Sequence, residues 1–137
     1  MSDVGNREEA EIVAAKKGLM IVTPAANELF VDIDDCESWH VFMRHFHIVK
    51  AALPGCVYTK RPSPSGAADR FHVVVTLPRD VATVFERIML QALLGSDRLH
   101  ETLSWRAAAC GSPEPTLFFE KLDVALEALS RAKGDAR

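Results

Sequence analysis

Two segments with alternating apolar and polar side chains constrain the fold of this chain more than any other feature. Residues 28–34 (ELFVDID) and 70–77 (RFHVVVTL) are short, rich in β-branched and aromatic residues, and have a period of two, so both predict strands. Side chains of a strand point alternately to the two faces of its sheet. Each strand therefore has one apolar face, built in the first segment by Leu29, Val31 and Ile33, and one partly polar face.

The remaining segments indicate an α+β domain. Apolar spacing and breaker residues predict helices over residues 37–53, 80–94 and 96–110, and strands over 56–60 and 115–120. Asp34 or Asp35 can cap the first helix, and Pro54 and Gly55 end it. The resulting order, with the third helix as an insert, is the βαββαβ pattern of ferredoxin-like and RNA-recognition-motif (RRM) folds. We expect an antiparallel four-stranded sheet of order 4-1-3-2 with helices on one face and the other face open.

The predicted elements divide the chain into three parts, and its 137 residues fit one domain. We expect residues 1–27 to form an N-terminal arm with a short edge strand near residues 19–24. We expect residues 28–120 to form the α+β domain. Residues 121–137 have apolar residues at helical spacing and predict an extra C-terminal helix and tail.

Composition excludes several classes of protein. A net charge of -3 argues against non-specific coating of nucleic acid, although a local basic groove stays compatible with it. Cys36, Cys56 and Cys110 form no CxxC pair, so a zinc knot or disulfide framework is disfavoured and a cytoplasmic location is expected. No apolar run reaches the roughly 18 residues of a membrane span. The N-terminus is too charged for a secretory signal.

Strand order brings the polar faces together. In the order 4-1-3-2 the segments 28–34 and 70–77 are neighbours, so Asp32, Asp34, Arg70 and His72 are expected on one open sheet surface. Two carboxylates at this spacing suit Mg²⁺ or Mn²⁺, which take oxygen ligands and bind through a few carboxylates plus substrate phosphates. The histidine and the arginine are groups expected around phosphates.

Further residues are candidates for the same site. Strand 56–60 is predicted to add Tyr58 and Lys60 to this face, with Lys60 as a phosphate contact. A third metal-ligating carboxylate is expected from Glu120, at the end of the fourth strand, or from Asp97. Simpler interpretations remain open for each acid, because Asp34 and Asp97 can be helix caps and Glu120 can be a solvated strand end.

A family resemblance adds to this interpretation. FVDID followed by SPSGAADRFHVVV resembles motifs I and II of the archaeo-eukaryotic primase superfamily, the primase-polymerases, across roughly residues 28–120. The stretch ERIMLQALLGSDRLHETL and the closing PTLFFE look like small phage or prophage proteins related to that group. The resemblance implies a palm-like domain in which Asp32 and Asp34 are metal ligands and His72 contacts the phosphates of the incoming nucleotide. Ser65 and Gly66 would then lie in the Ser/Gly-rich approach to that histidine.

This chain also departs from the family. Arg70 stands where the family usually has a serine, Glu120 stands where an aspartate is usual, and residues 1–27 leave little room for a further N-terminal α/β unit. The chain is therefore interpreted as a minimal or degenerate member.

The function expected from these features is metal-dependent nucleotidyl transfer in phage or mobile-element DNA replication. Mg²⁺ or Mn²⁺ would be the cofactor, and the expected partners are nucleoside triphosphate, DNA and another replication protein. The alternative is a non-catalytic module that binds single-stranded nucleic acid by stacking bases on Phe30, Tyr58 and Phe118, or a regulatory module on the same fold. A phosphatase of the haloacid-dehalogenase type is disfavoured, because Cys36 replaces the required Thr or Val and the chain is too short for its sheet.

Overall fold

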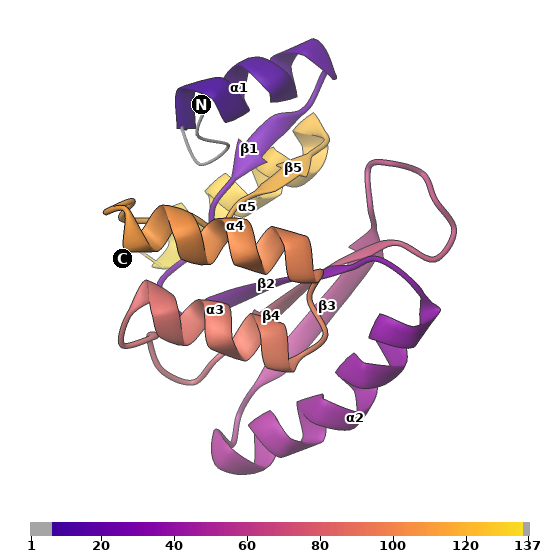
Figure 1. The fold of residues 1–137 in the computed structure, drawn as a ribbon, viewed down its shortest axis with the longest axis vertical. Coiled ribbons are helices and arrows are strands. Elements are labelled where there is room, and N and C mark those ends of the chain that lie inside the picture. The colour runs from indigo at the N-terminus through magenta and orange to yellow at the C-terminus, as the bar shows by residue number, and fades with distance from the viewer. Residues whose placement is uncertain (1–6, 136–137) are drawn as a thin grey trace.

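The computed structural model describes residues 7–135 and shows an α+β fold with two small antiparallel sheets (Figure 1). Its elements in chain order are α1 (Arg7–Lys16), β1 (Met20–Val22), β2 (Glu28–Ile33), α2 (Cys36–Ala52), β3 (Val57–Pro62), β4 (Phe71–Thr76), α3 (Val84–Leu93), α4 (Arg98–Ala109), β5 (Phe118–Glu120) and α5 (Leu122–Asp135). Residues 1–6 of the predicted N-terminal arm lie outside the described residues.

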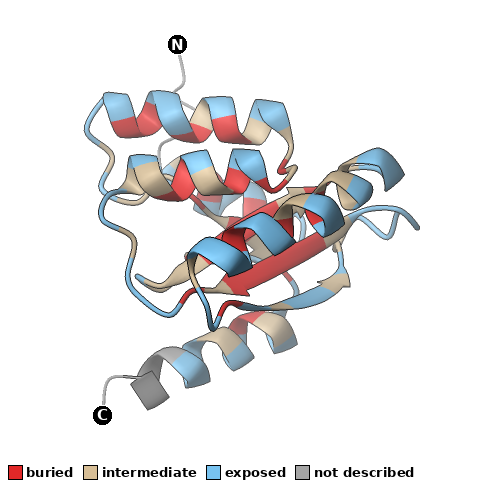
Figure 2. Cartoon of the chain, turned by 90° about the horizontal axis from the view of Figure 1, so that it is seen from below, coloured by how far each residue is buried: buried red, intermediate tan, exposed pale blue. Residues whose placement is uncertain are grey.

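The larger sheet has three strands in the order β2-β4-β3, with both pairs antiparallel. This confirms the 1-3-2 part of the predicted order. The apolar face predicted for β2 and β4 is buried against α2, whose contacting side chains include Phe42, Phe46 and Val49. Figure 2 shows this arrangement as buried strand residues beneath helices that expose their outer sides.

The second face of this sheet is not open. β1 and β5 pair antiparallel as a separate two-stranded sheet, and Phe118 of β5 packs on Phe30 and Val74. The ring of Phe118 stacks on that of Phe30 with 4.5 Å between the centroids and 5° between the planes. The fourth predicted strand therefore lies against the sheet instead of extending it, which corrects the expected four-stranded arrangement.

The free edge of β2 explains this difference. Side chains of α3 and of the α3–α4 connection occupy the backbone groups that a fourth strand would need. The main bonds are Arg87 Nε to the Glu28 carbonyl at 2.9 Å, the Phe30 amide to Gln91 Oε1 at 2.8 Å, and the Asp32 amide to Ser96 Oγ at 3.0 Å. The Asp97 amide also donates to the Asp32 carbonyl at 2.8 Å. These backbone groups of β2 are therefore already hydrogen-bonded and cannot pair with another strand.

Capping residues set the starts of the three central helices. Asp35, one of the two predicted caps, accepts from the Ser38 amide at 2.7 Å. Thr83 caps α3, which therefore begins later than the predicted 80–94. Asp97 caps α4. Each side chain satisfies an amide that the first helical turn leaves without an internal partner.

Two further expectations from the sequence concern the cysteines and a membrane-spanning helix. The three cysteines, all within the described residues, are unpaired. Of the helices between residues 7 and 135, none combines the length and the apolar character that a membrane span requires.

Candidate functional site

Asp32 and His72 are direct cross-strand neighbours on the second face of the larger sheet. The prediction that they share a face of adjacent strands is confirmed. His72 Nε2 lies 3.9 Å from Asp32 Oδ1, which is too long for a hydrogen bond. His72 is buried, whereas the carboxylate of Asp32 is partly exposed. The pair thus offers one reachable carboxylate beside one imidazole nitrogen.

Glu120 fixes the orientation of the His72 ring. Its buried carboxylate is hydrogen-bonded to His72 Nδ1, and Arg61 Nε lies 3.6 Å from its other oxygen. Glu120 therefore does reach the site, but as a partner of His72 and not as a solvated strand end. Because Nδ1–H donates to this carboxylate, Nε2 is the ring nitrogen left free on the side of Asp32, and it donates a hydrogen bond only when it carries a proton as well.

Phe118 supports the same ring from one side. The rings of His72 and Phe118 are stacked with centroids 3.9 Å apart and planes within 7°. Phe30 and Phe118 are only 1% and 4% exposed. These two rings, which the alternative function used to stack bases, are therefore core side chains in this arrangement.

His100, at the start of α4, is a second imidazole at the site. Its Nδ1 lies 3.3 Å from Glu101 Oε2, and its Nε2 lies 3.2 Å from the Leu117 carbonyl oxygen. Both partners are acceptors, so the ring satisfies both contacts only when both nitrogens carry a proton. Burial alone would lower the pKa of His100, but the hydrogen bond and charge of Glu101 and the charge of Asp32 outweigh it, so the pKa is raised.

The electrostatics of Asp32 reflect the same neighbours. Burial raises the pKa of Asp32, while the charges of His100 and His72 lower it and those of Asp97 and Asp34 raise it again. The net shift is upward, so the ionised carboxylate is less stable here than in water. A bound cation would remove that penalty.

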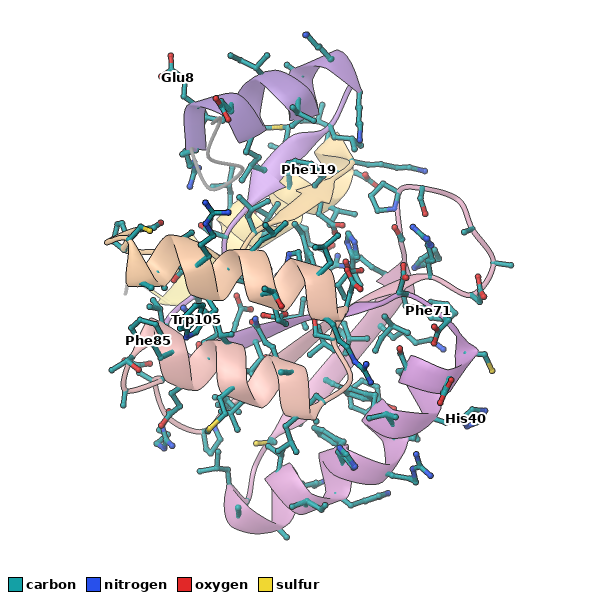
Figure 3. The ribbon with its side chains drawn as sticks, viewed as in Figure 1. Glu8, His40, Phe71, Phe85, Trp105 and Phe119 are labelled. Carbon is teal, nitrogen blue, oxygen red and sulfur yellow. The ribbon has the colours of Figure 1, made fainter. Side chains whose placement is uncertain are left out.

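An open pocket of about 370 Å³ connects these groups. It is lined by Asp32, His72 and His100 together with Lys17, which follows α1, and the hydroxyl-bearing Ser63 of the loop between β3 and β4. Ser65 and the β5 residues Phe118 and Phe119 complete much of the wall. Figure 3 labels Phe119 on β5, on the side of α1. The Lys17 ammonium lies 5.9 Å from the centre of the Phe119 ring. Carboxylate, imidazole, ammonium and hydroxyl groups thus face one space.

The remaining acids predicted for the site have other partners. Asp34 lies just beyond β2 and pairs with Arg70, with 3.2 Å between Oδ1 and the guanidinium Nη2. Asp97 accepts from the His100 amide at 3.2 Å as the cap of α4. Both line a neighbouring groove and not the Asp32 pocket.

The face predicted for strand 56–60 is wrong. Lys60 pairs with Val73 and Tyr58 with Val75, which both point to α2. The Lys60 ammonium lies 4.2 Å from the ring centres of Trp39 and Phe71, on the side of the sheet opposite Asp32. Arg61, which sequence reasoning missed, reaches the site instead.

The loop between β3 and β4 brings one of its two predicted residues to the pocket. Ser65 lines the pocket, and its hydroxyl donates to Ser63 Oγ at 3.2 Å. Gly66 has a φ of 78° in the same turn, a conformation that favours glycine. Gly66 therefore shapes the turn.

A complete protein cage for a metal is not present among the described side chains. Within residues 7–135, no three His, Cys, Asp or Glu residues are grouped so that they could hold a metal ion. An ion at Asp32 would need water or ligand oxygens for most of its coordination sphere.

Comparisons with protein-family models, with curated proteins and with solved structures found no match for this chain.

Proposed function

We propose that the Asp32–His72 pocket binds a nucleoside triphosphate together with Mg²⁺ or Mn²⁺ and serves nucleotidyl transfer to DNA. The setting would be a cytoplasmic replication protein of a phage or mobile element. One observation carries the proposal: a partly exposed carboxylate and an oriented imidazole, on adjacent strands, face the same pocket as an ammonium and two serine hydroxyls.

The donor set suits a hard cation that arrives with its phosphates. Mg²⁺ keeps several waters and is commonly bound through one or two carboxylates plus substrate phosphates, so a cage of three side chains is not required. Asp32 would be the first ligand. Asp34 could be the second after leaving Arg70, because the side chains of this ion pair are 42% and 49% exposed and the pair is therefore weakly held. The bound cation would polarise the phosphoryl group and neutralise developing charge.

The chain's own residues would hold the phosphates around that cation. Glu120 holds Nδ1 of His72, so Nε2, on the side of Asp32, is the nitrogen that in the imidazolium form would donate to a phosphate oxygen. Lys17, Ser63 and Ser65 line the same pocket and would supply further donors. The buried Glu120 would thus act by positioning the ring of His72.

The relation to a palm domain remains part of this proposal. The order β2, α2, β3, β4, α3 and the sheet order β2-β4-β3 are consistent with a ferredoxin-like core. In this core β5 would take the place of the fourth strand while lying across the sheet face, where its Glu120 still approaches the site.

Calorimetric titration with a non-hydrolysable nucleoside triphosphate, with Mn²⁺ and with chelator, tests the proposal. Binding should require the ion and should be lost in Asp32→Asn. A charge-assisted contact is worth about 1.5–3 kcal/mol, so His72→Ala should weaken binding by about ten- to a hundredfold. Asp69→Asn, at an exposed carboxylate of the β3–β4 loop, is the matched control and should bind normally.

Metal-independent binding, or binding that Asp32→Asn leaves intact, would contradict the proposal. Primer extension on a single-stranded template then separates binding from catalysis. A chain that binds the nucleotide but incorporates none would retain the site and lose the transfer activity.

A further inference from the structure

Several large apolar side chains of α3 and α4 are exposed to solvent. Met89 is 62% exposed and Trp105 is 56% exposed, and Phe85 and Leu99 are exposed as well. Figure 3 shows Phe85 and Trp105 at the same end of the two helices. Trp, Met and Phe are enriched at protein interfaces, so an exposed Trp105 is a candidate contact for a partner.

A groove of about 850 Å³ lies between the α3–α4 hairpin and the first turn of α2, and of these four exposed side chains only Trp105 lines it. Apolar side chains of α2 and α3 line it, namely Val41, Ile88 and Ala92, and Trp105 of α4 completes this apolar part. The groove is distinct from the Asp32–His72 pocket, with which it shares no lining residue. A ligand in the groove therefore does not occupy the Asp32–His72 pocket.

The lining of the groove is acidic, although Asp34 is paired with Arg70 and Glu101 is buried beside His100. Five acidic residues line it against a single basic one; these are Asp34, Asp35, Glu37, Asp97 and Glu101 against Arg98. Such a surface repels the phosphates of nucleic acids and of anionic lipids and attracts cationic groups. The charge therefore favours a basic protein segment as the occupant.

The dimensions favour a helical segment. α4 has 12 residues and so is about 18 Å long, which matches about three turns of a second helix laid along it. Helix-in-groove recognition uses apolar anchors at i, i+3, i+4 and i+7 on the docked helix. Trp105 is the natural contact for such an anchor, because large aromatic residues dominate binding energy at interfaces.

We infer that this groove docks a basic amphipathic helix of a partner protein. Its apolar stripe lies on Trp105, Ile88 and Ala92, and its Lys or Arg residues face Asp35 and Glu37.

Titration with model peptides tests this inference on the full chain. The probe is a peptide of about 14 leucine and lysine residues with its leucines at helical spacing, and the control replaces every lysine by glutamate. Calorimetry should show saturable binding of the lysine peptide and none of the glutamate peptide. Trp105→Ala should weaken the binding by about tenfold or more, as expected for a central aromatic contact.

Matched variants separate the groove from general surface effects. Glu37→Gln should weaken binding by about two- to fivefold through lost charge complementarity. Glu9→Gln, also an acid in a first helical turn but on α1, should leave it unchanged. In a Trp39→Phe background Trp105 is the single tryptophan, and its emission should shift to the blue on binding. If that background does not fold, calorimetry on the native chain decides.

Equal binding of both peptides, or an affinity unaltered by Trp105→Ala, would overturn the inference. Sedimentation of the native chain gives one more opposing outcome. A dimer that Trp105→Ala dissociates would identify a second copy, and not a basic helix, as the occupant.

Discussion

At the scale of single residues, His100 links the candidate site to the pH dependence of stability. Its raised pKa means that the folded state holds a proton more tightly than the unfolded chain, whose histidine has an ordinary pKa of 6.5. The stabilisation is complete below that value and is lost as the pH rises through the higher folded pKa. We predict that the free energy of unfolding falls across this window with a slope of at most about 1.4 kcal/mol per pH unit from this residue.

Urea unfolding at a series of pH values from 6.5 upward measures this slope. His100→Gln should flatten it, because glutamine cannot gain a proton. His47→Gln, at an exposed position of α2, serves as the control. Identical slopes for the native chain and His100→Gln would show that the ring does not gain its proton on folding.

Residue faces could be predicted where a strand carries an alternating set of apolar side chains. β2 and β4 are largely buried, and their alternating pattern placed Asp32 beside His72 correctly. β3 is an edge strand that is exposed or partly exposed along its length, so its sequence VYTKRP carries no apolar alternation. Lys60 and Tyr58 were therefore predicted on the wrong face, and Arg61 was missed.

At the scale of elements, α3 competes with β5 for the edge of β2. Arg87 and Gln91 are four residues apart, so they lie on the same side of the helix, and both are buried. Two polar residues on the inner side of an apolar helix are the sequence signal that could have indicated edge capping. The pairing of β5 with β1 could not be predicted, because it depends on this tertiary competition and not on local propensity.

Replacing Gln91 tests how much this edge capping contributes to stability. Its side chain accepts from the Phe30 amide at 2.8 Å and donates to Glu101 at 2.8 Å. Gln91→Met keeps most of the volume but leaves a buried amide and a buried carboxylate without these partners. An unsatisfied buried polar group costs about 1–3 kcal/mol. We therefore predict that the free energy of unfolding, measured with urea, falls by about 2–5 kcal/mol.

Thr102→Val is the control, because Thr102 is an exposed polar residue of the same α3–α4 hairpin. Its free energy of unfolding should stay within about 0.5 kcal/mol of the native value. A Gln91→Met chain as stable as the native one would indicate that β2 has an alternative edge partner. Hydrogen exchange at the Phe30 amide would then locate it.

At the scale of the whole molecule, two structural units meet at the candidate site. One unit is the three-stranded sheet with α2, and the other consists of β1 and β5 with α1 and α5, which both contact β1. Figure 1 shows this second unit at one end of the molecule, at a distance from α2. Phe118 and Glu120 of β5 join the units, since both contact His72. The pocket therefore exists only while the units stay docked.

Phe118→Ala should undock the second unit before the sheet unfolds. The ring is buried and stacks on both Phe30 and His72, so its removal should cost about 3–5 kcal/mol. Because those contacts join the two units, hydrogen exchange should accelerate first in α1, β1 and β5, while β2 and β4 keep their protection. Phe119→Ala is the control for hydrogen exchange, since its ring is partly exposed and has a cation–π contact with Lys17. Nucleotide binding should also fall in Phe118→Ala, because His72 loses its stacked support. A uniform loss of protection across all strands would show instead that the two units unfold as one.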